Sequence, residues 1–166
     1  GVIKHDLTPA KEKAIRAAMT KALQSGYAEL KAGKSAMDAV SAAIVVLEDD
    51  PNFNAGKGAV FTHDGKNELD AAIMDGDSRR AGAVAGVQRI RNPILLARAV
   101  MEKTPYVMLS GQGAEAFAQS IGMPLVDPSY FRTEQRWQQL QKALKEDAAG
   151  KPHEDEDAAK HFGTVG

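Results

Sequence analysis

Cysteine is absent from this sequence of 166 residues. Its absence excludes disulfides, thiolate nucleophiles and cysteine metal sites, and it leaves both oxidising and reducing compartments open. An excess of one charge is missing too, because 21 Lys and Arg residues face 22 Asp and Glu residues. Aromatic residues make up only 5% of the chain. The composition therefore gives no reason to expect a nucleic acid or an anionic membrane as a partner.

Long hydrophobic runs are also missing. The longest ones, residues 42–47 and 93–97, fall far short of the roughly 20 apolar residues that cross a bilayer. Residues 1–6 lack the pattern of a signal peptide. We expect a soluble, cytoplasmic protein, with the periplasm as the alternative if a signal peptide has been removed.

Hydrophobic periodicity and capping signals predict an α/β (α+β) chain with one core, for which 43% hydrophobic residues are sufficient. Thr8-Pro9 is typical of a helix start, and Ser35 with Asp38 three residues later resembles a capping box. The expected helices cover residues 9–30, 36–47, 93–101, 113–121 and a stretch around 137–144.

Strands are expected between these helices, at residues 59–62, 69–74, 81–87 and 106–109. Asp64-Gly65 is a residue pair that tight hairpin turns favour, so the first two strands should form a β-hairpin. Residues 81–87 consist of small residues and valine, which suits a strand buried on both faces in the centre of a sheet.

The composition changes towards the end of the chain. From Lys145 to His161 it consists mainly of Lys, Glu, Asp, Ala and Gly without an apolar face, as in a solvated linker. We therefore divide the chain into a core of residues 1–144, a linker of residues 145–163, and residues 164–166 as the start of another unit.

Thr164 follows this linker directly. A threonine hydroxyl is a weak nucleophile until a base takes its proton, and a free α-amino group on the same residue, with a pKa near ~8, can be that base. Cleavage between Gly163 and Thr164 would free this amine, and glycine tolerates backbone conformations that strain other residues. Taken alone, a tetrapeptide such as Gly-Thr-Val-Gly at residues 163–166 is more often a flexible turn than a cleavage site.

A second candidate is the segment from Leu47 to Gly58. Its glycines can bend backbone carbonyls inward around a hard cation, which prefers oxygen ligands. A helix end followed by an ordinary loop, with Glu48, Asp49 and Asp50 as solvated charges, is the commoner explanation. Acidic side chains at the end of a helix oppose its dipole, however, which indicates that another group holds them.

Together with the Thr164 motif, further segments resemble one known family. In sequence order they are SAMDAV (35–40), LEDDPNFNAG (47–56), DAAIMDG (70–76), AGAVAGV (81–87), NPI (92–94), VMEKTP (100–105) and GTVG (163–166). Each motif is modest, but this order is specific, and it is similar to that of plant-type asparaginases/isoaspartyl peptidases. These are N-terminal-nucleophile hydrolases, and the resemblance, to the α-subunit part of the precursor, runs over essentially the whole chain.

The resemblance implies an αββα sandwich made as a precursor that cleaves itself between Gly163 and Thr164. This chain would supply the α-subunit half, the β-subunit would come from the same precursor, and two such units would pair as an (αβ)2 dimer. Freed Thr164 would attack the side-chain amide of L-asparagine or the isopeptide bond of a β-aspartyl dipeptide, with the preference between them open.

The resemblance also implies a structural sodium ion and no cofactor for the chemistry. The backbone carbonyls that hold the ion in the family match those of Leu47, Glu48, Asp50, Phe53, Ala55 and Lys57. By the same match, Asn54 should lie close to the nucleophile.

Two departures from the family pattern bear on activity. The family has a preceding strand and a His-Gly-Gly-Ala-Gly loop, of which Gly1 matches only the last residue, and it continues beyond Gly166 into the whole β-subunit. We expect this chain alone to be inactive, since a nucleophile without oxyanion donors loses most of the rate enhancement.

Rival hypotheses stay open beside this one. They are a catalytically silent α/β interaction or scaffold module, a threonine endopeptidase of the same group, and a glycosylasparaginase. Gly163 disfavours the last, because those enzymes have an aspartate before the threonine.

Overall fold

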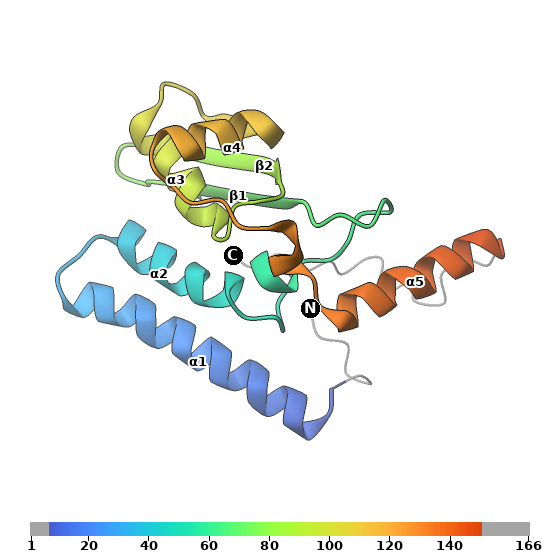
Figure 1. Ribbon diagram of the computed structural model, residues 1–166. Coiled ribbons are helices and arrows are strands. Elements are labelled where there is room, and N and C mark those ends of the chain that lie inside the picture. The colour runs from blue at the N-terminus through green and yellow to red at the C-terminus, as the bar shows by residue number, and fades with distance from the viewer. Residues whose placement is uncertain (1–6, 151–166) are drawn as a thin grey trace.

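The computed structural model describes residues 7–150 of the chain (Figure 1). In chain order its elements are α1 (Pro9–Lys31), α2 (Ala36–Glu48), the 3-10 helix η2 (Gly56–Gly58), β1 (Leu69–Met74), β2 (Ala81–Val87), α3 (Pro93–Lys103), β3 (Met108–Ser110), α4 (Gly111–Ser120), the 3-10 helix η3 (Pro128–Phe131) and α5 (Glu134–Ala148). The predicted mixture of helices and strands is confirmed. None of the helices in this part of the chain is both long and apolar enough to span a membrane.

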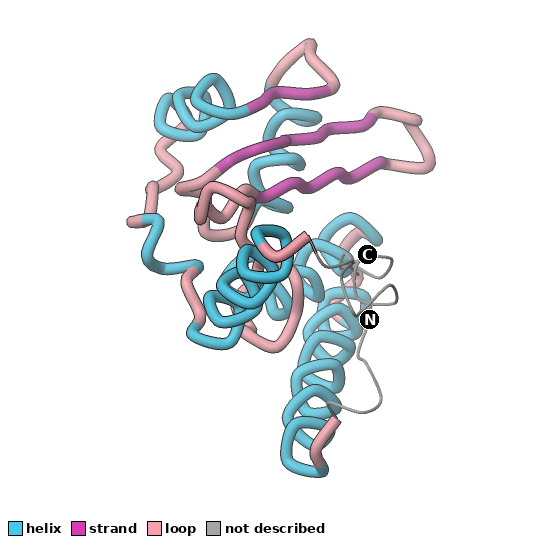
Figure 2. Tube along the Cα trace, turned by 90° about the vertical axis from the view of Figure 1, so that its right-hand side faces the viewer, coloured by secondary structure: helices cyan, strands magenta, loops and turns pink. Residues whose placement is uncertain are grey.

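The three strands lie side by side in the order β1-β2-β3 (Figure 2). β1 and β2 are antiparallel, whereas β2 and β3 are parallel. The parallel pair is joined by α3, as a crossover connection requires, and α3 packs against β1 and β2. One face of the sheet is therefore covered by α3, with α4 beside it.

The hydrophobic core lies between that covered face and the helices. Its fully buried large side chains are Phe131, Ile90, Ile94, Leu96, Val84, Val87, Val100 and Pro93. They come from β2, α3, the loop between them and η3, so burial of apolar surface fixes these segments relative to one another.

The first two helices form an antiparallel pair below the sheet in Figure 1. The predicted capping box is present at the start of α2, because the Asp38 N–H donates to Ser35 Oγ at 3.1 Å and the Ser35 N–H donates to Asp38 Oδ2 at 3.1 Å. The pair packs closely at Gly26, where a Cβ atom would lie 2.9 Å from the Ala39 carbonyl oxygen. α2 also contacts α3 and so links this pair to the core.

The predicted hairpin between residues 59–62 and 69–74 is wrong. The tight turn does form, since the Gly65 N–H donates to the Thr62 carbonyl oxygen at 2.9 Å. The carbonyl oxygens of Ala59 and Val60, however, accept from the Asn67 side chain at 3.0 and 3.1 Å. That side chain replaces a partner strand, and residues 69–74 pair with β2 instead.

The helix near the end of the described residues is longer than the sequence predicts. α5 continues to Ala148, beyond residue 144, where the linker was expected to begin. Pairs of opposite charge four residues apart stabilise a helix even without an apolar face. One such pair is Lys142 and Glu146, whose Nζ and Oε1 atoms lie 3.6 Å apart. Residues 151–163 of the expected linker lie outside the described residues.

Gly82 is the position in β2 where an added side chain fits least. A Cβ atom there would lie 2.1 Å from the Ala97 carbonyl oxygen and 2.7 Å from the Met101 Cβ atom. Gly82→Ala should therefore push α3 from the sheet and lower the free energy of unfolding by about 1–3 kcal/mol. Gly76→Ala is the matched control, since nothing lies within 4 Å of a Cβ atom at Gly76. Equal stabilities of the two variants in denaturant unfolding would contradict this packing.

Candidate functional site

The loop between α2 and the sheet folds tightly back on itself. A Cβ atom on Gly56, whose φ is +48°, would lie 2.2 Å from the Glu48 carbonyl oxygen. A Cβ atom on Gly58 would lie 2.1 Å from the Phe53 carbonyl oxygen. Only glycine fits at these two positions, and the contacts place the carbonyl oxygens of Glu48 and Phe53 against the backbone of residues 56 and 58.

The backbone carbonyls of this loop are the oxygen atoms that a cation would use. Those of Asp50 and Ala55 each accept one backbone N–H within the loop, from Phe53 and Gly58 at 3.4 and 3.0 Å. A carbonyl oxygen has two lone pairs, so each keeps capacity for a further partner. Backbone oxygens of this kind are ligands that a hard cation prefers. Among residues 7–150, no three His, Cys, Asp or Glu side chains gather into a metal site.

Glu48, the last residue of α2, is buried, with only 4% of its surface exposed. Its Oε1 accepts the Ile94 N–H at 3.0 Å, at the start of α3, where the helix dipole favours a negative charge. Its Oε2 has no hydrogen-bond partner within the described part of the chain. Burial raises the pKa of Glu48 to about 7, although the Ile94 N–H opposes this effect.

Asp49 is the C-cap residue of α2, and its carboxylate accepts hydrogen bonds from two other segments. Its carboxylate accepts two hydrogen bonds from the Arg91 guanidinium, at 3.1 and 3.0 Å, and one from the Asn92 side chain at 3.2 Å. The Tyr130 hydroxyl donates to the same carboxylate at 3.2 Å. Burial raises the pKa of Asp49, but these donors outweigh burial and lower it.

The acidic residues at the end of α2 are therefore held by the rest of the fold. Their interpretation as solvated charges is wrong for Glu48 and Asp49, and the indication that another group holds them is confirmed. Asp50 differs, because its Oδ1 accepts the Asn52 N–H at 2.9 Å in a local turn.

Asn54 has a fixed orientation in the loop. Its Oδ1 accepts the Val60 N–H at 2.9 Å, so the side-chain NH2 is the end that can donate to another group. Gly163 and Thr164 lie outside the described residues, and the proximity of Asn54 to the nucleophile stays a prediction.

Two residues that bind this loop were missed by the sequence reasoning. Arg136, in the first turn of α5, donates from Nε to the Gly58 carbonyl oxygen at 2.9 Å. Tyr130 contacts Asp49 and also lies 5.6 Å from the Lys57 ammonium, measured to the ring centre. Roughly 70 to 80 residues separate each from the loop, and no local pattern signals such a contact.

Two surface hollows of the described residues lie away from this loop. One surface hollow lies beside α3 and is bordered by Leu95 and Met123, and another lies beside β2 and α4, bordered by Gln88 and Gln119. Neither is lined by a residue of the loop.

The chain is similar to known proteins. The chain matches the family model described as asparaginase over residues 1–166. It is 49% identical over 151 residues to the isoaspartyl peptidase of Escherichia coli (strain K12), covering 90% of this chain and 47% of that protein. It is 45% identical over 161 residues to the isoaspartyl peptidase/L-asparaginase of Rattus norvegicus, covering 97% of this chain and 47% of that protein.

An archaeal relative shows a higher identity over a shorter stretch. The chain is 54% identical over 123 residues to the plant-type L-asparaginase of Pyrococcus abyssi (strain GE5 / Orsay), covering 74% of this chain and 40% of that protein. The chain therefore spans about half the length of the curated relatives it matches.

The burial of Glu48 makes stability depend on pH. Its folded pKa of about 7 lies above the ordinary value of 4.5, so between these values the folded state binds the proton more tightly than the unfolded state. The resulting stabilisation is fully present below about pH 4.5 and is lost as the pH rises through about 7. At roughly 1.4 kcal/mol per pKa unit, the loss is on the order of 3 kcal/mol.

Glu48→Gln removes this titration while keeping the size of the side chain. Between about pH 4.5 and 7, the free energy of unfolding of the parent protein should fall relative to that of the variant, and above pH 7 the two should run parallel. Urea unfolding of both proteins across this range checks the difference. Parallel curves throughout would contradict a raised pKa of Glu48.

Proposed function

Because the chain belongs to the asparaginase family, we propose that it is the α-subunit part of a self-cleaving threonine amidohydrolase. The observation that carries this proposal is the family match over residues 1–166, which includes the Gly163-Thr164 motif. Relatives named isoaspartyl peptidase and L-asparaginase support hydrolysis of an amide bond on the β-carboxyl of aspartate. We take L-asparagine and β-aspartyl dipeptides as the substrates.

Self-cleavage comes first in this proposal. The Thr164 hydroxyl attacks the Gly163 carbonyl carbon, the peptide nitrogen leaves as the α-amine of Thr164, and Gly163 is held as an ester. Water then hydrolyses the ester and leaves a Gly163 carboxylate and a free Thr164. The freed α-amine is the base that the hydroxyl lacked.

Substrate hydrolysis repeats the same chemistry. The α-amine of Thr164 takes the hydroxyl proton, and the hydroxyl oxygen attacks the side-chain carbonyl of the substrate. Ammonia leaves from L-asparagine, or an amino acid leaves from a β-aspartyl dipeptide, and a β-aspartyl ester on Thr164 forms. Water hydrolyses this ester to aspartate and regenerates the enzyme.

The loop after α2 is the proposed sodium site. A bound sodium ion supplies a fixed positive charge that holds the loop carbonyls together. Its ligands are the backbone carbonyls of Leu47, Glu48, Asp50, Phe53, Ala55 and Lys57. The glycine contacts at Gly56 and Gly58 support this role, because they already bring two of these carbonyls close to the opposite half of the loop. Asn54 then projects its side chain from a rigid support towards Thr164.

Within residues 7–150 one face of the sheet is uncovered, which supports a second half that packs on it. Leu69 and Ile73 of β1 are buried towards the helices, whereas Met74 is 59% exposed on the opposite face. The register extends this apolar face across the sheet, from Ala72 to Ala83 of β2 and on to Met108 of β3, which is 54% exposed. Exposed apolar faces mark interaction surfaces, and a second sheet on this one gives the αββα sandwich.

The β-subunit is the proposed partner on that face, and two αβ units pair as an (αβ)2 dimer. The β-subunit contributes the remaining substrate-binding groups and the oxyanion donors. The described chain alone is therefore inactive in this proposal.

Replacing the nucleophile tests the proposed function in the full-length protein. The parent protein should yield two fragments that meet at Gly163 and Thr164, and should release ammonia from L-asparagine. Thr164→Ala should stay uncut and lose at least ~1,000-fold in ammonia release, because it has neither the hydroxyl nor the freed amine. Intact-mass spectrometry and an ammonia assay measure both effects.

Thr164→Ser is the matched control, since it keeps a hydroxyl at the same position. It should still cleave, though more slowly than the parent protein. Cleavage of Thr164→Ala at the same bond, or ammonia release at the parent rate, would rule out Thr164 as the nucleophile.

A further inference from the structure

We propose that residues 128–137, called the strap here, hold the sodium-binding loop in its binding conformation. The strap consists of η3 and the first turn of α5, and its positioning residues are Tyr130 and Arg136. This inference rests on the proposed sodium site, and it adds two side chains that act on that site from a distant part of the sequence.

Tyr130 joins the two ends of the loop. Its hydroxyl donates to Asp49 Oδ1 at 3.2 Å, near the start of the loop. Its ring lies 5.6 Å from the ammonium of Lys57, close to the end of the loop, in a cation–π contact. One rigid side chain thereby fixes the distance between the start of the loop and its last proposed ligand position.

Tyr130 is itself firmly anchored. The next residue, Phe131, has no exposed surface and lies in the hydrophobic core. The rings of Tyr130 and Phe131 pack edge to face, with their centres 5.2 Å apart. The Arg91 guanidinium lies 5.5 Å from the centre of the Tyr130 ring and also binds Asp49. Movement of Tyr130 would therefore disturb the core as well as the loop.

Arg136 holds the other side of the loop. Its Nε donates to the Gly58 carbonyl oxygen at 2.9 Å. Its Nη1 donates to Gln139 Oε1 at 3.0 Å, which helps to orient the guanidinium. Charge-assisted bonds of this kind are stronger than neutral ones. Gly58 packs against the Phe53 carbonyl oxygen, so the hold on Gly58 extends to a proposed ligand.

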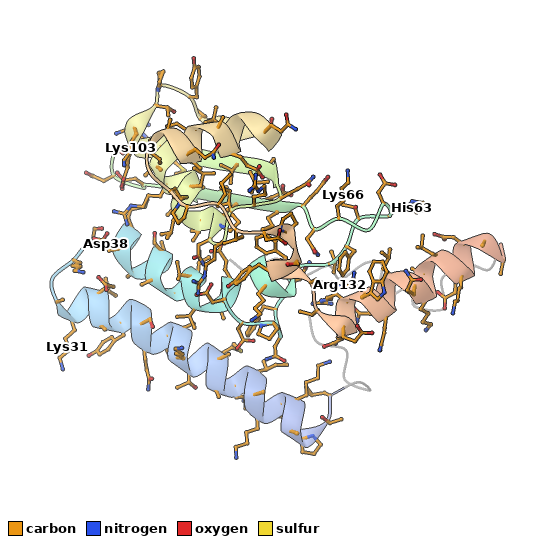
Figure 3. The ribbon with its side chains drawn as sticks, viewed as in Figure 1. Lys31, Asp38, His63, Lys66, Lys103 and Arg132 are labelled. Atoms are coloured by element: carbon orange, nitrogen blue, oxygen red, sulfur yellow. The ribbon has the colours of Figure 1, made fainter. Side chains whose placement is uncertain are left out.

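The strap has a second attachment just after the loop. The Arg132 guanidinium, labelled in Figure 3, lies over the Trp137 ring at 4.1 Å from its centre. Trp137 in turn packs edge to face on Phe61, with their ring centres 5.3 Å apart. The strap is therefore attached to the chain on both sides of the loop.

These contacts reach the flanks and the backbone of the loop, so the strap acts on sodium binding through the shape of the loop. A site whose ligands are already in place loses less conformational entropy when it binds an ion, and it binds more tightly. Loss of a contact that Tyr130 or Arg136 makes with the loop should therefore weaken sodium binding without removing a ligand.

Sodium-dependent thermal stability of the full-length protein tests this inference. The melting temperature is measured against sodium chloride concentration, with choline chloride added to keep the ionic strength constant. Arg136→Gln should raise the sodium concentration at half-effect by about tenfold, and Tyr130→Phe by about threefold to fivefold. At saturating sodium, both variants should recover most of their lost melting temperature.

Arg132→Gln is the matched control, because the contact that it removes, with the Trp137 ring, lies within the strap and does not reach the loop. Its half-effect concentration should stay within about twofold of the parent value. If Arg136→Gln does not fold, Tyr130→Phe decides the question, because it removes a single hydroxyl.

Three outcomes would overturn the inference. If the strap were purely structural, Arg136→Gln and Tyr130→Phe would lower the melting temperature equally at all sodium concentrations and leave the half-effect concentration unchanged. If the half-effect sodium concentration of Arg132→Gln rose as much as that of Arg136→Gln, the effect would come from the loss of a positive charge in general. A parent protein without any sodium-specific response would overturn the proposed sodium site and the strap's role together, which distinguishes it from the first two outcomes.

Discussion

Two consecutive carboxylates at the end of α2 are the constraint on which the rest of the structure depends. Glu48 is buried and bonded to the first turn of α3, while Asp49 collects donors from Arg91, Asn92 and Tyr130. Burying a carboxylate is costly unless hydrogen bonds compensate for the lost water. The fold supplies the bonds to Asp49 and to Oε1 of Glu48 only if α2, α3 and η3 meet at this point, so the junction fixes where the following loop begins.

That junction links the layers of the fold to the proposed chemistry. α3 covers one face of the sheet, and its N-terminus faces the buried Glu48. The loop that starts at the junction carries Asn54 and the proposed sodium ligands, and Arg136 closes it from α5. The opposite face of the sheet, with Met74 and Met108 exposed, is left for the second half of the proposed enzyme.

Local signals in the sequence predicted the local structure well. The capping box of Ser35 and Asp38, for example, depends on residues three apart and is present. The predicted hairpin at residues 59–74 does not form, because the Asn67 side chain donates to the carbonyl oxygens of Ala59 and Val60 that a partner strand would have used. The tertiary contacts of the loop were beyond prediction from local pattern, since Tyr130 and Arg136 lie far from it in sequence. The acidic run after Leu47 did carry a usable signal, because unfavourable charge at a helix end requires a partner.

The central claim is that this loop, held by the Glu48–Asp49 junction, supports the nucleophile of a self-cleaving amidohydrolase. A crystal structure of the full-length protein grown in sodium tests it most directly. We expect a sodium ion enclosed by the carbonyls of residues 47–57, with the Asn54 side chain beside the hydroxyl of Thr164. A loop without an ion, or Thr164 remote from Asn54 in a folded and cleaved protein, would contradict it.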